Sequence, residues 1–182
     1  LYMLSKSGSN ERQLVLCDFG INEGDPVFLN IGNHHPVSLF GGSTNTAAIG
    51  SEGEVIFINR FSVLKSPKSP IAAFYLPDGE KASSVACGDS LIIVLSSNGR
   101  VFTSPVESNR VINFSPVSEL SREVIVCVSC TNHHILAVSK EGYVFGRGIN
   151  QFGQLGLGKG TKSVSSFREI QSLYRYKIRA AY

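Results

Sequence analysis

Short apolar runs alternate with polar turns along this chain, and the pattern predicts β-strands rather than helices. Three segments share one order, in which an apolar run, a polar turn closing on glycine and a second apolar run follow one another; they are residues 46–57, 92–103 and 135–146. Val, Ile and Phe favour extended backbone, and Gly99 after Asn98 supplies the positive φ that a tight turn needs. Each segment therefore predicts a β-hairpin.

The turn glycines recur at a nearly regular interval. Gly53, Gly99 and Gly142 lie 46 and 43 residues apart. Upstream of each hairpin another apolar run indicates a further strand, over residues 36–40, 82–87 and 124–130. A period therefore holds at least three strands, and the longer stretches between units leave room for a fourth. In one such stretch, residues 166–169 are predicted to open a short helical turn.

A period of about 40–50 residues that holds several strands is typical of a β-propeller. We therefore expect an all-β fold, a partial propeller of roughly three and a half blades. Residues 1–2 resemble the start of a strand after a turn glycine, and residues 177–182 resemble the strand that opens a unit. Residues 1–182 are thus expected to form one propeller segment. Its approximate repeat units are 1–38, 39–84, 85–127 and 128–179, followed by the start of another unit.

The unit with the third hairpin carries a longer signature. Residues 144–158 are Val-Phe-Gly-Arg-Gly-Ile-Asn-Gln-Phe-Gly-Gln-Leu-Gly-Leu-Gly, and upstream Cys130 is followed four residues later by His134. Together these residues resemble the hallmark of the regulator of chromosome condensation repeat family. The resemblance is strong over residues 124–158 and weak elsewhere, where the period and the turn glycines are the main signs. Arg147 stands where the family usually has Trp, and Thr131 replaces a Gly.

The resemblance implies a seven-bladed propeller with four-stranded blades, of which this chain would supply about half. It also implies a binding platform for a protein partner, such as a small GTPase or chromatin, rather than an enzyme. The alternative that it carries is guanine-nucleotide exchange on a Ran-like small GTPase. No catalytic, metal-binding or cofactor-binding residue, no cofactor and no small-molecule substrate are expected. The partner-binding residues stay unassigned, because the loops that would bear them match no motif.

Cys127-x-x-Cys130 has the spacing of a metal or redox pair, and His133 with His134 would complete a set of four ligands. These side chains fall within eight residues, with no loop to bring them around a tetrahedron. The separation of the two cysteines is odd, so on a strand they face opposite sides. We interpret both as ordinary strand cysteines. A Cys/His hydrolase or metal enzyme that uses Cys130 with these histidines, or with the pair at 34–35, stays as a remote alternative.

Residues 153–159, Gly-Gln-Leu-Gly-Leu-Gly-Lys, match the first part of a phosphate-binding loop and follow a predicted strand. Gly160 stands where such a loop needs a Ser or Thr hydroxyl for magnesium, and the sequence after it is a poor helix start. We interpret these glycines instead as turn residues at the edge of the sheet.

Charge and composition add little to these predictions. The net charge of +3 is too small to indicate nucleic acid, although residues 159–179 hold six basic residues and one acidic residue. That segment favours an acidic partner or phosphate, or is simply a solvated polar stretch. No apolar run has the length of a membrane span, and no signal peptide is seen. Four irregularly spaced cysteines indicate reduced thiols, so we expect an intracellular protein, cytoplasmic or nuclear.

Overall fold

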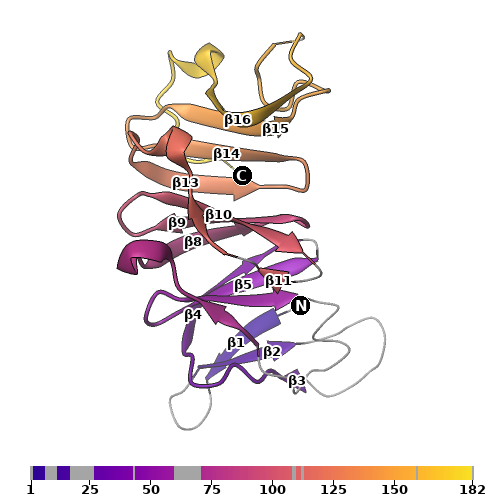
Figure 1. Cartoon of the computed structure of the whole chain (residues 1–182), viewed down its shortest axis with the longest axis vertical. Coiled ribbons are helices and arrows are strands. Elements are labelled where there is room, and N and C mark those ends of the chain that lie inside the picture. Colours follow the sequence, from indigo (N-terminus) through magenta and orange to yellow (C-terminus); the bar gives the residue numbers. More distant parts are fainter. Residues whose placement is uncertain are drawn as a thin grey trace.

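The computed structural model describes residues 2–6, 12–16, 27–42, 44–59, 71–107, 110–111, 113–158 and 160–181. Within these ranges the regular elements are β-strands and three short 3-10 helices. Figure 1 shows four sheets stacked along the long axis in chain order, from the indigo N-terminal end to the yellow C-terminal end. The expectation of an all-β fold is therefore confirmed.

Each sheet consists of antiparallel strands. The first sheet contains β1 (Tyr2–Lys6), β2 (Arg12–Leu16) and β3 (Val27–Phe28). The second contains β4 (Pro36–Gly41), β5 (Asn45–Gly50), β6 (Val55–Asn59) and β7 (Ala73–Phe74). The third contains β8 (Ala82–Cys87), β9 (Leu91–Ser96), β10 (Val101–Glu107), β11 (Arg110–Val111) and β12 (Ser115–Pro116). The fourth contains β13 (Ile125–Cys130), β14 (His134–Ser139), β15 (Val144–Ile149) and β16 (Ser163–Glu169).

The predicted hairpins correspond to β5–β6, β9–β10 and β14–β15, and the predicted upstream strands are β4, β8 and β13. The fourth strand for which the period left room is present as β7, β12 and β16. The helical turn predicted at Ser166–Glu169 was wrong, because these residues lie in β16, where Val164 and Phe167 are buried and the backbone pairs with β15. A 3-10 helix follows each fourth strand instead: η1 (Pro77–Gly79), η2 (Ser118–Leu120) and η3 (Gln171–Leu173).

The core lies between the sheets, and β9 shows how it is built. Ile92 and Val94 point into a cluster shared with the second sheet, whereas Ile93 and Leu95 point into a cluster shared with the fourth. Successive side chains of a strand face opposite sides, so a strand covered on both faces must be apolar at every position. This explains why the run at 91–95 is continuously apolar. Phe102 on β10 is fully buried in the first of these clusters.

Two constraints act on each turn glycine. Gly53, Gly99 and Gly142 have φ values of +84°, +79° and +94°, a region that residues with a Cβ rarely adopt. A Cβ at the same glycines would also lie 2.5–2.9 Å from the segment that follows η1, η2 or η3, at Lys81, Val124 and Lys177 respectively. Glycine therefore recurs at this position for two reasons: the turn needs a positive φ, and the neighbouring segment packs too closely for a Cβ.

The same turns join consecutive sheets by hydrogen bonds. The carbonyl of Gly53 accepts the backbone N–H of Ala82 at 2.9 Å, and that of Gly99 accepts the N–H of Ile125 at 2.9 Å. The carbonyl of Gly142 accepts the N–H of Ile178 at 3.3 Å. Ile178 therefore takes the position that opens β8 and β13 in the preceding sheets.

Candidate partner-binding surfaces

The strands deliver their connections to two opposed sides of the stack. One side of the stack carries the hairpin turns together with the linkers that hold η1, η2 and η3. Hydrogen bonds join turn to linker: the N–H groups of Ser97 and Lys140, in two of the turns, donate to the carbonyls of Lys81 and Val124 in two of the linkers. We call this side the turn face; it is on the left in Figure 1. The other side, the loop face, holds the connection from first to second strand in the second, third and fourth sheets and the long connection from β15 to β16.

The long connection between β15 and β16 is held from within by one buried amide. Asn150 is 3 % exposed, and its Nδ2 donates to the carbonyls of Thr161 at 2.7 Å and Gly158 at 3.3 Å. Its Oδ1 accepts the backbone N–H of Leu155 at 2.8 Å. Leu155 is itself buried, close enough to Gly146 that a Cβ there would come within 3.0 Å of the leucine Cδ2. The loop is thus fixed by a hydrogen-bonded centre and an apolar anchor.

Phe152 projects from the tip of this fixed loop. Its side chain is 91 % exposed, the highest value among the exposed large apolar residues of the described chain. The backbone around it is held, since the N–H of Phe152 donates to Gln154 Oε1 at 3.0 Å and that of Gly153 donates to the carbonyl of Asn150 at 3.0 Å. The sequence analysis did not single out Phe152. The sequence feature that could have indicated an exposed aromatic residue is the position of Phe152 in a turn, between Asn150 and a turn glycine.

The glycines that suggested a phosphate-binding loop serve as turn residues. Gly153, Gly156 and Gly158 all have positive φ. The N–H groups of Gly153, Leu155 and Gly156 are directed to Asn150 and Gly153 rather than outward. The next regular element after residue 158 in the described chain is the strand β16, and no helix N-terminus is there to face an anion. Lys159 lies outside the described residues.

Elsewhere on the loop face, polar side chains link three sheets in a row. Thr44 Oγ1 donates to Asp89 Oδ1 at 2.6 Å, and Asn132 Nδ2 donates to Asp89 Oδ2. Beneath them the buried Asn45 donates through Nδ2 to the carbonyls of Gly88 at 2.8 Å and Asp89 at 3.1 Å. Buried amides with satisfied partners specify one arrangement of neighbouring elements. This ladder therefore fixes the relative position of the second, third and fourth sheets.

The candidate cysteines behave as strand residues. Cys127 packs beside the cluster of Val138, Val144 and Ile170, whereas Cys130 packs beside the cluster between the third and fourth sheets, so the two face opposite sides as predicted. Burial raises the pKa of Cys130 to about 11 and that of Cys87, with a smaller contribution from Cys130, to about 12. Such thiols are protonated at neutral pH and are poor nucleophiles.

The candidate histidines are not brought together. His34 lies beside the turn face, where its Nδ1 is 3.0 Å from Oε1 of the buried Glu54. His134 lies at the loop face, where its Nδ1 is 3.0 Å from Thr131 Oγ1. That threonine hydroxyl also accepts the N–H groups of His133 and His134 at 3.2 Å. Within the described ranges, no three His, Cys, Asp or Glu side chains gather closely enough to hold a metal ion.

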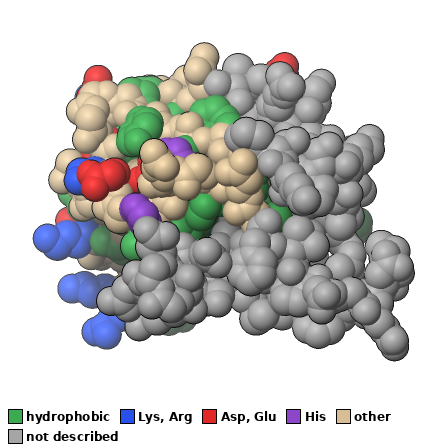
Figure 2. All heavy atoms as spheres, turned by 90° about the horizontal axis from the view of Figure 1, so that it is seen from below, with side chains coloured by type: hydrophobic (Ala, Val, Ile, Leu, Met, Phe, Trp, Pro, Cys, Tyr) green, Lys and Arg blue, Asp and Glu red, His purple; other side chains and the backbone are tan. Residues whose placement is uncertain are grey.

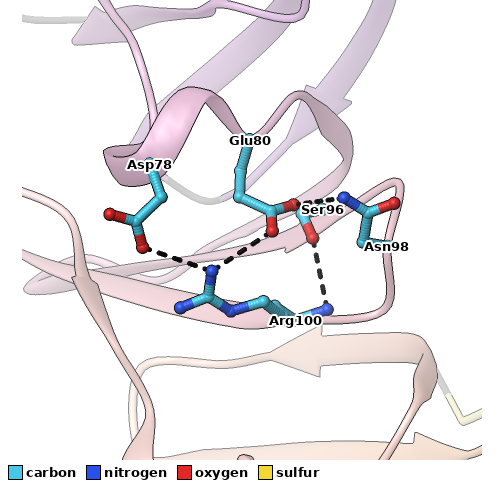
Figure 3. A network of polar contacts seen from close by, with 5 residues as sticks. All are labelled: Asp78, Glu80, Ser96, Asn98 and Arg100. Carbon is cyan, nitrogen blue, oxygen red and sulfur yellow. Dashed lines mark hydrogen bonds and ion pairs between the residues drawn. The ribbon is translucent and has the colours of Figure 1, made fainter.

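A compact charge network occupies the turn face beside η1 (Figure 3). The Arg100 guanidinium lies 3.2 Å from Glu80 Oε1 and 3.3 Å from Asp78 Oδ2, and Asn98 Nδ2 donates to Glu80 Oε2 at 3.1 Å. Burial alone would raise the pKa of Glu80, but hydrogen bonds from Ser96, Arg100 and Asn98 together hold it below its ordinary value. The charge of Arg100 is therefore balanced within the protein.

Farther along the turn face, basic and aromatic side chains gather around the last hairpin turn. Lys140, Arg175 and Lys177 are exposed, and so are Tyr174 and Tyr176. Tyr143 completes the group, its ring 5.7 Å from that of Tyr174 at 89°. We call these six residues the C-terminal turn patch. Figure 2, which views the molecule from below, shows Lys and Arg side chains gathered at the left edge of the described surface, the side of the turn face.

Comparison with known proteins identifies one repeat directly. A family model described as the regulator of chromosome condensation (RCC1) repeat matches residues 125–154, which run from β13 into the loop that carries Phe152. Human "Probable E3 ubiquitin-protein ligase HERC6" is 36 % identical over 99 residues, 49 % of this chain and 10 % of that protein. Human "Protein RCC2" is 44 % identical over 68 residues, 37 % of this chain and 12 % of that protein.

Solved structures extend the similarity to most of the chain. Prp20p from Saccharomyces cerevisiae superposes with a TM-score of 0.67 at 15 % identity, over 93 % of this chain and 50 % of that one. Human WBSCR16 gives a TM-score of 0.66 at 16 % identity, again over 93 % and 50 %. These matches show the fold and confirm a partial β-propeller. The chain spans about a tenth of these curated relatives and half of the solved chains.

Proposed function

We propose that this chain works as a protein-interaction platform, because residues 125–154 match the regulator of chromosome condensation repeat and its sheets superpose on solved β-propellers. Stacked sheets hold loops at two opposed faces, and loops on a rigid scaffold are where binding residues concentrate. The match to HERC6 covers a tenth of that ligase, so its catalytic activity does not carry over to this chain. The proposal needs no cofactor, no small-molecule substrate and no catalytic residue.

The observation that carries the proposal is the exposed ring of Phe152 on a loop that Asn150 and Leu155 hold in place. Aromatic residues supply a large share of the energy at protein interfaces, and a large apolar side chain in water gains by being covered. A rigid loop loses little conformational entropy when it binds. Phe152 therefore has both properties of an anchor residue: an exposed aromatic ring and a backbone that is already fixed.

The test is capture of partners from a cell extract by the full-length protein, compared with Phe152→Ala and with Gln151→Ala as the matched control. Gln151 is exposed on the same loop and differs in lacking the apolar ring. We expect Phe152→Ala to lose a partner that both the native protein and Gln151→Ala retain. Identical partner sets for the three proteins would refute Phe152 as the anchor.

Guanine-nucleotide exchange on a Ran-like small GTPase is the second candidate. Prp20p shares this fold, and its solved structure is described together with its binding properties to Gsp1p and histones. Exchange needs loops that distort the nucleotide site of a GTPase and needs no covalent chemistry. A Ran-like GTPase loaded with fluorescent GDP tests it directly: strong acceleration of release by the full-length protein supports exchange, and an unchanged rate rejects it.

The proposal extends to the propeller of which this chain would be a part, to its partners and to its place in the cell. The chain covers half of each propeller that it resembles, so we propose that it contributes about half of a seven-bladed ring, with repeat units near 1–38, 39–84, 85–127 and 128–179. The partners that we propose are proteins, including a small GTPase or chromatin, inside the cell, in the cytoplasm or nucleus. No helix in the described part of the chain is long and apolar enough to cross a membrane.

A further inference from the structure

We propose that the C-terminal turn patch, Lys140, Tyr143, Tyr174, Arg175, Tyr176 and Lys177, binds an acidic segment of a protein partner. The inference rests on the proposed function, because it gives the interaction platform a second contact surface and states the chemistry of what binds there. The patch lies on the turn face, whereas Phe152 lies on the loop that runs from β15 to β16.

Backbone contacts bring the patch together from two segments far apart in the sequence. The N–H of Ile178 donates to the carbonyl of Gly142, and the Lys177 Cα lies 2.9 Å from where a Cβ on Gly142 would stand. The turn that carries Lys140 therefore lies directly against the segment that carries Arg175 and Lys177. The edge-to-face contact of Tyr143 and Tyr174 closes the same junction.

The cations of the patch form no ion pair with a described residue, although Glu169 accepts a hydrogen bond from the Tyr174 hydroxyl at 2.9 Å. Ion pairs between described residues involve His34 and Arg100, and no described carboxylate lies within 4.0 Å of a side-chain nitrogen of Lys140, Arg175 or Lys177. The corresponding turn of the third sheet is different, because Arg100 there is bound by Asp78 and Glu80. The same site in the fold thus holds its cation between two carboxylates in one sheet and leaves its cations open to an external anion in the next.

The exposure of this patch follows from its position in the sheet. Lys81 occupies in the third sheet the position that Lys177 occupies beside Gly142, and Lys81 is exposed although sheets pack on both sides of it. Side chains at this position therefore point to solvent along the turn face. Lys177 is exposed in the same way.

The composition of the patch favours an acidic protein segment over nucleic acid. The patch holds three cations, but Glu141 is exposed in the same turn, and Glu169 accepts a hydrogen bond from the Tyr174 hydroxyl at 2.9 Å. The neighbouring network sets two carboxylates against the single cation Arg100. A nucleic-acid backbone needs a longer stripe of unbalanced cations. A short acidic segment matches the size of the patch, and tyrosines are enriched where protein partners bind.

The test measures binding of a labelled acidic peptide, rich in Asp and Glu, to the full-length protein by fluorescence anisotropy. Its Asn/Gln counterpart and labelled single-stranded and double-stranded DNA serve as competing probes. The double variant Arg175→Glu with Lys177→Glu is compared with the double variant Lys81→Glu with Arg122→Glu, which changes net charge equally at exposed turn-face positions of other linkers. Thermal melting checks that both variants stay folded.

We expect the patch variant to bind the acidic peptide at least tenfold more weakly, while the control variant stays within about twofold of the native protein. Equal losses in both variants would show that net charge alone attracts the peptide and would overturn the proposal. Tighter binding of DNA than of the peptide would overturn it in favour of nucleic acid. The capture assay with Phe152→Ala is independent, so failure here with that assay positive rejects the patch and leaves the platform standing.

Discussion

Glu80 and Arg100 on the turn face occupy the same positions in the third sheet that His34 and Glu54 occupy in the second, with the acidic and basic partners exchanged. His34 and Glu80 each lie two residues before the first strand, and Glu54 and Arg100 each follow the turn glycine. The contacts are 3.0 Å between His34 Nδ1 and Glu54 Oε1, and 3.2 Å between Arg100 and Glu80 Oε1. The repeat thus conserves the place of a polar contact between linker and turn but not the order of its charges.

The network around Glu80 makes stability depend on pH in a defined direction. Its pKa is lower in the folded protein than the value of 4.5 expected for a free side chain, so the stabilisation is present above that value and is lost as the pH falls through the folded pKa. We expect Glu80→Gln to flatten the change in unfolding midpoint between pH 6 and pH 3, as measured with urea. Glu52→Gln, at an exposed residue of the equivalent turn in the second sheet, serves as the control and keeps the native profile. A native profile in Glu80→Gln would contradict this account.

Gly99 is predicted to be intolerant of any side chain. An alanine there must adopt φ near +79° and bring its Cβ to 2.6 Å from Val124 Cγ1, against the strand that opens the next sheet. The backbone conformation alone costs about 1–2 kcal/mol, and the clash adds to it. We expect Gly99→Ala to lower the free energy of unfolding by at least about 2 kcal/mol. Gly160→Ala, where nothing lies within 4 Å, is expected to be near neutral, and similar losses in both variants would refute the packing explanation.

Two phenylalanines at opposite extremes of burial separate stability from binding. Phe102 is fully buried between the second and third sheets, and its replacement by alanine is expected to cost about 3–5 kcal/mol. Phe152 is 91 % exposed, and Phe152→Ala is expected to change stability by less than about 0.5 kcal/mol. Denaturant unfolding of the two variants measures both values. A large loss in Phe152→Ala would mean that the ring supports the fold rather than a partner.

Asn150 is predicted to act on binding through the loop. Asn150→Ala removes the acceptor of the Leu155 N–H and the donor to Thr161, and one such loss in a buried site costs about 1–3 kcal/mol. We expect faster hydrogen exchange at Leu155 and weaker capture of the partner that depends on Phe152. The reverse pattern, with slow exchange retained and capture lost, would place Asn150 in the interface itself.

The sequence predicted the three hairpins and the strand before each of them, but not β2, β3 and β11, and not the surfaces. Val, Ile and Phe runs closing on Gly53, Gly99 and Gly142 predicted the hairpins, because strand propensity and turn geometry are local properties. The error at Ser166–Glu169 arose because pairing with β15, a partner well separated in sequence, decides that segment. The exposure of Phe152 depends on how Asn150 and Leu155 hold the loop, and the open charge of Lys177 depends on which residues the last turn brings beside it. Neither follows from strand propensity or turn geometry.

The most direct test of the platform is the affinity of the full-length protein for the partner that it captures, measured for the native protein and for Phe152→Ala. An anchor residue of this type contributes about 2 kcal/mol or more, which corresponds to a roughly thirtyfold change in Kd. We expect Phe152→Ala to bind at least tenfold more weakly while its melting temperature stays unchanged. Equal affinities would contradict the account and show that this loop does not carry the interaction.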